Sequence, residues 1–415
     1  MSITAAHYME GQVRSKPCDD SHESTDCIHR HPSANIPAYL SNSLKQPERI
    51  LIRGVNWLGD AIMTTPALMA VRKKFPDAKI SLATRENLAE LWTEHPAINE
   101  VIRIDRKQSP LRIGREWRGE RFDLAIILPN SLRSAMECML ARIPVRLGYK
   151  GAGRSWMLTQ RIPKRRDVFH MKVLSDREVE RAIASQGAKP EIPAHSHHVA
   201  HYLHLVSQIG APGEWTAPIL HVSDHDVTAT AQRFGMAVKP DCPVIGINPG
   251  AQYGPAKRWP IENFVSTVTR LHEKARCQFV LFGGPADEEI TDEISVALRS
   301  EHGEGSISFF NASGRTSLRE LATLLKHCDV LISNDTGPTH LAAAVGTAVV
   351  VPFGSTSPEL TGPGLPGGND HAFLKSETPC SPCFRRDCPI DFRCMDDITV
   401  DRVVTAVCEA IAVSG

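Results

Sequence analysis

The chain has 415 residues, 42% of them hydrophobic, which is enough for two domains that each bury a core. Lys+Arg and Asp+Glu number 47 each, so the formal net charge is zero and no global field favours nucleic acid or membrane binding. No run approaches the apolar length of a transmembrane helix. Because residues 1–46 show no basic region followed by an apolar one, we expect no secretory signal there. The 11 cysteines are spread out apart from one C-terminal cluster, which favours a reducing compartment.

Residues 1–46 differ in composition from the rest of the chain. They are rich in Ser, His, Pro, Asp and Asn and show no sustained apolar periodicity, so ordering them would gain too little buried surface. Cys18 and Cys27 lie among histidines here, but their spacing matches no standard zinc pattern. We expect a disordered tail.

Residues 47–210 alternate between strand and helix patterns, which predicts a mostly parallel α/β sheet with right-handed crossovers. The expected strands are 49–53, 80–84, 98–104 and 123–129, and the expected helical segments are 61–75, 86–95 and 114–121. Ligands of such sheets bind at the carboxyl ends of the strands. The loops at 54–60 and 129–134 are therefore candidate site loops.

Asp60 stands near the start of the first predicted helix. Gly54 and Gly59 before it resemble a P-loop superficially, but no Lys-Ser/Thr pair follows, so an ATPase site is excluded. Two interpretations of Asp60 stay open. It is either a capping or first-turn carboxylate stabilised by the helix dipole, or a general base that faces a cleft.

Two further clusters in this region have alternative interpretations. The chain is locally basic between Arg133 and Arg166, which fits either a solvated face or a surface for an anionic acceptor. Histidines crowd residues 195–204, and three of them, at 197, 201 and 204, would share one helical face. A helix that packs on the first domain and a metal site both fit this spacing.

Residues 211–225 are rich in turn formers and are expected to be an interdomain linker. A second strand–helix series over 226–396 predicts a second doubly wound domain, and 397–415 has the spacing of an amphipathic helix. The expected strands begin at residues 243, 278, 306, 330 and 348.

The segment Val330–Val345 is the most informative stretch of the second domain. A short apolar strand leads through a turn of small residues into an Ala/Leu-rich helix, and a helix N-terminus of this kind binds anions. Two other loops, 248–260 with Lys257 and 283–289, also follow strands. A lysine from one loop and a helix N-terminus from another could hold a diphosphate. No DxD motif accompanies these loops.

Several motifs in order resemble one family. They are GVNWLGDAIMTTPAL, LPNSLRSA, PGAQYGPAKRWP, NDTGPTHLAAA and FGSTSPE. Together, over about residues 50 to 410, they resemble the ADP-heptose:lipopolysaccharide heptosyltransferases of glycosyltransferase family 9, and the heptosyltransferase II type most closely. The resemblance implies a GT-B fold, in which two Rossmann-like doubly wound α/β domains face each other across a cleft.

The resemblance also assigns residues to roles. Asp60 matches the proposed catalytic base, and Lys257 matches the lysine that meets the donor phosphate. Asp335 is expected near the heptose hydroxyls, and Thr336 and Gly337 on the diphosphate. His340 completes the D-(T/S)-G-x-x-H motif for ADP-heptose. The basic segment 133–166 becomes a contact for the phosphorylated inner core, without individual assignments.

The implied reaction is an inverting, metal-independent transfer without a cofactor. Heptose would pass from ADP-L-glycero-β-D-manno-heptose to the lipid-linked, phosphorylated heptosyl-Kdo₂-lipid A, at the cytoplasmic face of the inner membrane, with peripheral membrane contact. The alternatives are a heptosyltransferase of type I or III, a related transferase with another acceptor, or a nucleotide-sugar binding module without catalysis.

Four cysteines, Cys380, Cys383, Cys388 and Cys394, form a C-x2-C-x4-C-x5-C pattern. Four thiolates could hold structural zinc or an iron–sulfur cluster, but the later spacings match no standard ribbon. Similar loops look familiar from family 9, where metal is not part of the chemistry. The thiols are otherwise free or paired in disulfides.

Overall fold

The computed structural model describes residues 46–151, 153–185, 189–238, 240–365, 368 and 370–414. These residues fall within one compact unit. Apart from Gln46, the predicted tail with Cys18 and Cys27 lies outside the described residues. Within the described ranges, no helix is both long enough and apolar enough to cross a bilayer.

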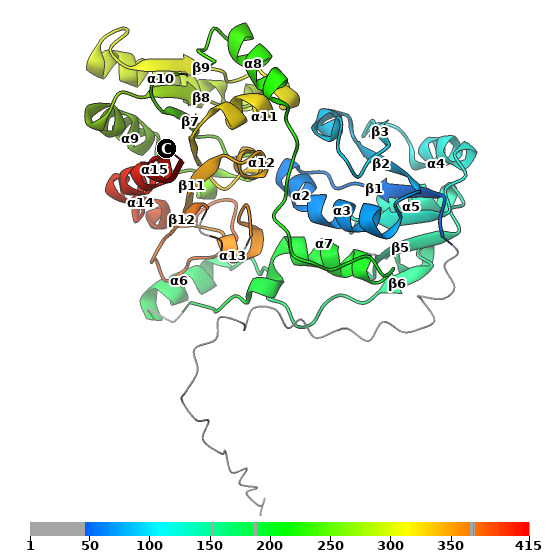
Figure 1. Cartoon of the computed structure of the whole chain (residues 1–415). Coiled ribbons are helices and arrows are strands. Elements are labelled where there is room, and N and C mark those ends of the chain that lie inside the picture. The colour runs from blue at the N-terminus through cyan, green and yellow to red at the C-terminus, as the bar shows by residue number, and fades with distance from the viewer. Residues whose placement is uncertain are drawn as a thin grey trace, which may run out of the picture. The chain divides into compact units, whose positions relative to one another are not determined.

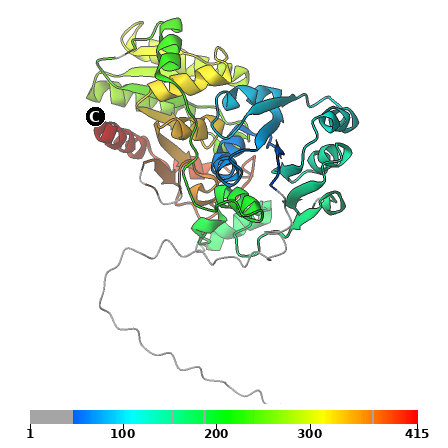
Figure 2. The same ribbon diagram turned by 45° about the vertical axis from the view of Figure 1, so that its right-hand side comes forward.

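Two six-stranded sheets form the framework (Figures 1 and 2). The first has the order β3-β2-β1-β4-β5-β6 and the second the order β12-β11-β10-β7-β8-β9, with parallel pairing. Counted from its own first strand, each sheet has the order 3-2-1-4-5-6 of a doubly wound Rossmann fold. The predicted fold class is confirmed. The strands of the first sheet are β1 (Arg49–Arg53), β2 (Lys79–Arg85), β3 (Glu100–Ile104), β4 (Leu124–Ile127), β5 (Val145–Tyr149) and β6 (Gln160–Ile162).

The second sheet repeats the pattern. Its strands are β7 (Val244–Asn248), β8 (Gln278–Leu281), β9 (Ser308–Asn311), β10 (Val330–Ser333), β11 (Ala348–Phe353) and β12 (Ala372–Lys375). The central strands β4, β7 and β10 are buried along their whole length, because helices cover both faces of a parallel sheet. The strand order reverses between β1 and β4 and between β7 and β10, and ligands bind at such points.

Helices cover both faces of each sheet. Those of the first half are α2 (Leu58–Met63), α3 (Thr65–Lys74), α4 (Pro110–Gly119), α5 (Leu132–Leu140), α6 (Asp176–Ser185) and α7 (His198–Ser207). Those of the second half are α8 (Asp224–Arg233), α9 (Ile261–Lys274), α10 (Glu288–His302), α11 (Leu318–His327), α12 (Gly337–Ala344), α13 (Pro358–Thr361), α14 (Arg393–Asp396) and α15 (Val400–Ser414). One apolar cluster joins α2, α3 and α7 with α11 and α12, so the cores of the two halves are continuous.

The structure differs from two of the predicted helices. The helix predicted over 61–75 is two helices, α2 and α3, which meet at Thr64. Pro66 lies at the start of α3, where its missing N–H costs little, whereas inside one continuous helix it would remove a hydrogen bond. The helix predicted over 86–95 is a 3₁₀ segment, η1 (Glu86–Trp92).

The segment between β6 and α7 crosses to the second half of the chain. Leu174 donates its N–H to the carbonyl of Cys383 at 3.0 Å, and Asp176 pairs with Arg385 at 2.7 Å. Lys189 donates to the carbonyl of Ser376 at 2.5 Å. The sequence places this segment in the domain 47–210, and these domain limits stay a prediction. The contacts show that α6 packs on the loop that carries Cys380, Cys383, Cys388 and Cys394, called here the cysteine loop.

A buried ion pair anchors the end of β1. Arg53 and Glu137 are 5% and 0% exposed, and Arg53 Nε donates to Glu137 Oε2 at 2.8 Å. Arg53 also donates to the carbonyl of Gly54, and Arg133 donates to the other oxygen of Glu137. The pair therefore fixes the start of the loop 54–60, which leads to Asp60.

Replacing Glu137 with Ala should leave the Arg53 guanidinium buried and unpaired. Breaking one side of a buried ion pair costs about 3–5 kcal/mol in the free energy of unfolding. Glu116→Ala is the matched control, because Glu116 pairs with Arg112 on the exposed surface of α4, where about 0–1 kcal/mol is expected. Urea denaturation measures both; equal losses would contradict the role of the buried pair.

Candidate functional site

The N-termini of α2 and α12 lie directly against each other. A Cβ added to Gly59 would lie 2.8 Å from Cδ2 of His340, and one added to Gly337 would lie 2.9 Å from Cβ of Leu58. Both glycines therefore permit an approach that any side chain would prevent. The contact brings the loop after β1 beside the loop after β10, and so joins Asp60 to the motif 335–340.

Lys257, Asp335 and Thr356 form one polar group after β7, β10 and β11. Lys257 Nζ lies 2.5 Å from Asp335 Oδ2, and the Thr356 hydroxyl donates to the same oxygen at 2.7 Å. The side chains of Lys257 and Asp335 are only 14% and 5% exposed, and the Lys257 ammonium also lies over the ring of Tyr253. The predicted pairing of a lysine from one loop with the N-terminus of α12 is present in space.

His340 is buried in the first turn of α12. It is 5% exposed, and its Nδ1 has no hydrogen-bond partner. Burial lowers the pKa of His340 to about 4, against the opposing effect of the nearby Asp335 and Asp60 carboxylates. A neutral imidazole with an unsatisfied buried nitrogen requires explanation, and a bound ligand is one source of the missing partner.

Thr336 and Gly337 lie at the start of α12. Thr336 is the N-cap of α12 and Gly337 its first residue, although no side-chain capping bond is made. Asn334 ties this turn to the loop 248–260, because its side chain accepts from Trp259 N at 3.0 Å and donates to the carbonyl of Pro249. The predicted loop 283–289 lies against the loop 248–260 as well, because a Cβ added to Gly250 would clash with Asp287.

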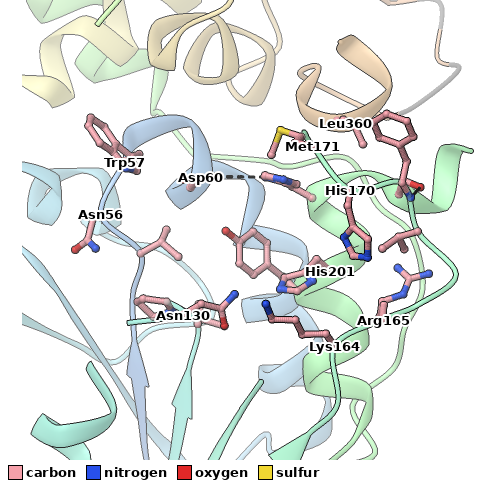
Figure 3. A pocket seen from close by; sticks show the side chains of 18 residues that line it. Asn56, Trp57, Asp60, Asn130, Lys164, Arg165, His170, Met171, His201 and Leu360 are labelled. Carbon is pink, nitrogen blue, oxygen red and sulfur yellow. Dashed lines mark hydrogen bonds and ion pairs between the residues drawn. The ribbon is translucent and has the colours of Figure 1, made fainter. Parts of the chain in front are cut away.

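Asp60 lines a cavity of about 390 Å³ (Figure 3). Its carboxylate belongs to the first turn of α2, but it caps nothing, because the N-cap is Trp57 and no side-chain capping bond exists. The cavity is lined by Val55, Asn56, Trp57, Asp60, Leu128, Pro129, Asn130, Lys164, Arg165, Val168, Phe169, His170, Met171, Ser196, His198, His201, Tyr202 and Leu360. Lys257 and residues 335–340 do not line it; they lie beyond the Gly59–His340 contact.

The basic run 133–166 divides into different environments. Lys164 and Arg165 line the cavity, and Lys164 is exposed. Arg154 is fully buried and donates to Tyr149 and Pro129 carbonyls and to Asn130 Oδ1, so it shapes the LPNS loop. Desolvation lowers the pKa of Arg154 to about 10. Part of the run is therefore structural.

The histidines of α7 make protein contacts. His201 stacks on Tyr149 with ring centroids 4.1 Å apart, and His204 Nδ1 lies 2.7 Å from the Tyr149 hydroxyl. His197 caps α7 and bonds through Nε2 to the carbonyl of Gly362, which belongs to the second half. These contacts favour the interpretation of a helix that packs on the first domain.

The four cysteines of the C-terminal cluster carry free thiols. Burial raises the pKa of the Cys394 thiol to about 12, and the neighbouring thiols act in the same direction. Cys380 and Cys383 pack against Val179 of α6. Across the described residues, no group of three or more His, Cys, Asp or Glu side chains is arranged to hold a metal ion.

The comparison with protein families decides the assignment. The family model of glycosyltransferase family 9 (heptosyltransferase) matches residues 110–186 and 174–392. This chain belongs to glycosyltransferase family 9. The resemblance that its motifs indicate is confirmed.

Relatives within the family cover most of the chain. Lipopolysaccharide heptosyltransferase 2 of Salmonella typhimurium strain LT2 is 30% identical over 321 residues, which are 76% of this chain and 85% of the relative. The Escherichia coli K12 protein of the same name is 30% identical over 326 residues with the same coverage. The structure of E. coli ADP-heptose LPS heptosyltransferase II superimposes with a TM-score of 0.68 at 26% identity, over 88% of this chain and 98% of that one.

Several residues of this family 9 site were not singled out in the sequence. Thr356 belongs to the motif FGSTSPE and Asn130 to the motif LPNS. Both motifs contributed to the family resemblance, but nothing in the sequence distinguished these two residues within them. His198 was one histidine in a crowded run, and Lys164 one cation among nine. Only their shared position around Asp60 distinguishes them.

Proposed function

We propose that this chain transfers heptose from ADP-L-glycero-β-D-manno-heptose to heptosyl-Kdo₂-lipid A in the lipopolysaccharide inner core, with inversion and without a metal. The observation that carries the proposal is the Asp60 carboxylate, which opens into a cavity while its own helix touches the motif 335–340. Membership of family 9 and the names of the relatives support the same reaction.

The donor would bind at the N-terminus of α12. Backbone N–H groups and the helix dipole at Thr336 and Gly337 suit a diphosphate, and Lys257 adds a positive charge beside them. The unpartnered Nδ1 of His340 is placed to meet a ligand atom. Asp335 would accept hydrogen bonds from heptose hydroxyls, since a carboxylate has acceptor sites beyond those that Lys257 and Thr356 occupy.

The chemistry follows from the opposed positions of Asp60 and the donor loop. Asp60 takes the proton of the acceptor hydroxyl while that oxygen attacks the anomeric carbon, with an oxocarbenium-like transition state by analogy with glycoside chemistry. The bond from the anomeric carbon to phosphate breaks, and ADP leaves with the electron pair. The N-terminus of α12 and Lys257 stabilise the growing charge, so no metal is required. Attack from the face opposite to ADP inverts the anomeric centre.

The acceptor would occupy the cavity in front of Asp60. Lys164, Arg165 and the Asn130 side chain give this cavity hydrogen-bond donors for phosphate or carboxylate groups of the inner core. Arg165 is already paired with Asp167 at 2.8 Å, whereas Lys164 forms no hydrogen bond or ion pair with the other described residues. Because the acceptor is lipid-linked, the enzyme would work peripherally at the cytoplasmic face of the inner membrane.

Asp60→Ala should abolish most transfer. Removal of a general base costs roughly 10²–10⁴-fold in rate. The assay combines ADP-heptose with heptosyl-Kdo₂-lipid A and, separately, with Kdo₂-lipid A, and only the first should accept heptose. Asp77→Ala, an exposed loop aspartate, is the control. Activity of Asp60→Ala near that of wild type would remove Asp60 from this role, and transfer to the acceptor without heptose would favour the type I alternative.

Asp335→Asn should weaken donor binding while the fold is kept. The change removes the negative charge that pairs with Lys257 and one of the carboxylate oxygens that would accept hydrogen bonds from heptose hydroxyls. A charge-assisted hydrogen bond is worth about 1.5–3 kcal/mol. Calorimetric titration with ADP-heptose should show about a tenfold or greater rise in the dissociation constant. Asp401→Asn on α15, which breaks an exposed pair with Arg270 of α9, is the matched control. An unchanged dissociation constant would refute the donor assignment.

Lys164→Ala should raise KM for the acceptor and leave KM for ADP-heptose unchanged. Because Lys164 is exposed, water and salt screen its charge, and we expect about a three- to tenfold effect. Arg166→Ala changes a neighbouring exposed cation that does not line the cavity. The effect should shrink with a dephosphorylated acceptor; an equal rise in KM for donor and acceptor would contradict a role on the acceptor side.

A further inference from the structure

His198 lies beside Asp60 and forms an ion pair with it when the imidazole is protonated. Its Nδ1 lies 3.6 Å from Asp60 Oδ1, and the two side chains are 31% and 29% exposed in the same cavity. A dashed line marks the contact in Figure 3. The distance is that of a loose ion pair and exceeds a hydrogen bond, as is common for catalytic contacts before substrate binds.

We propose that His198 is a positioning residue that acts through Asp60: it takes over the proton that this carboxylate removes from the acceptor hydroxyl. This inference rests on the function proposed above and deepens it. It gives the first residue of α7 a part in the reaction, although the sequence of the chain offers no reason to prefer it over its neighbours.

The proton balance of this step is simple. The acceptor O–H bond breaks as the new bond to the anomeric carbon forms, and the proton goes to Asp60. The proton then passes from Asp60 to the unprotonated Nδ1 of a neutral His198, which faces this carboxylate. The resulting imidazolium loses a proton to water, since the side chain is partly exposed. The Asp60 carboxylate is thereby restored for the next turnover.

The other nearby histidines are less suited to this task. Burial lowers the pKa of His201 to about 3 and that of His197 to about 4. His197 also uses both ring nitrogens, toward Gly362 and Val199. His340 is almost completely buried, so it has no direct exit to water. His198 combines contact with Asp60 and access to solvent.

His198 lies among several titratable and charged side chains. The groups that face it are Asp60, Lys164, Arg165, His170, His197, His201, Tyr202 and His340. Proton uptake requires an unprotonated ring nitrogen, so protonation of His198 at acidic pH should lower the rate.

His198→Gln tests the proposal, because glutamine keeps a polar side chain that does not titrate. With ADP-heptose and heptosyl-Kdo₂-lipid A, kcat should fall about tenfold or more with KM for ADP-heptose within twofold of wild type. The acid limb of the kcat profile should move to lower pH. His198→Ala should regain part of its activity in buffer with free imidazole. His225→Gln, on the exposed start of α8, is the control.

Thermal unfolding checks the fold, and His198→Asn replaces the Gln variant if that one does not fold. The double variant Asp60→Ala/His198→Gln separates a role through Asp60 from an independent one. It should be within twofold of Asp60→Ala alone, because His198 acts through that carboxylate. Additive losses, or a His198→Gln enzyme with wild-type kcat and pH profile, would overturn the inference while an inactive Asp60→Ala upholds the proposed function. A fully active Asp60→Ala would overturn both.

Discussion

The close approach of α2 and α12 is the constraint on which the site depends. It requires glycine at positions 59 and 337, because Cβ atoms there would clash with His340 and Leu58. The contact brings together the carboxyl ends of two central strands. The segment after β1 carries Asp60, and the segment after β10 carries the motif 335–340. Two helix N-termini thus meet at the proposed reacting centre, where negative charge is expected to develop.

In the proposed donor site, the pairing of Lys257 with Asp335 places the positive charge in a neutral, preorganised group. A lysine that is 14% exposed would be costly to leave unpaired, and Asp335 together with the ring of Tyr253 holds it beside the start of α12. A phosphate of the proposed donor would have to compete with the Asp335 carboxylate for this ammonium. The arrangement would keep the cation in place before the donor binds, which would limit the reorganisation that binding requires.

The proposed acceptor cavity is formed by segments that are far apart in the sequence. The first turn of α2 provides Asp60, the loop after β4 provides Asn130, the crossing segment provides Lys164, and α7 provides His198. The crossing segment is also tied to the cysteine loop of the second half by Leu174 and Arg385. Movement of one half relative to the other would therefore alter the cavity and not only the donor loop.

The amino-acid sequence by itself determined the α/β class, most of the central strands and the donor motif, since these depend on local apolar periodicity and on short loops with a fixed order. It could not place β5, β6 or α6, nor foresee that Pro66 divides one predicted helix. Above all, it could not choose His198 among five neighbouring histidines, or Lys164 among nine cations. Only the tertiary structure decided those, because proximity to Asp60 arises from packing between segments that are distant along the chain.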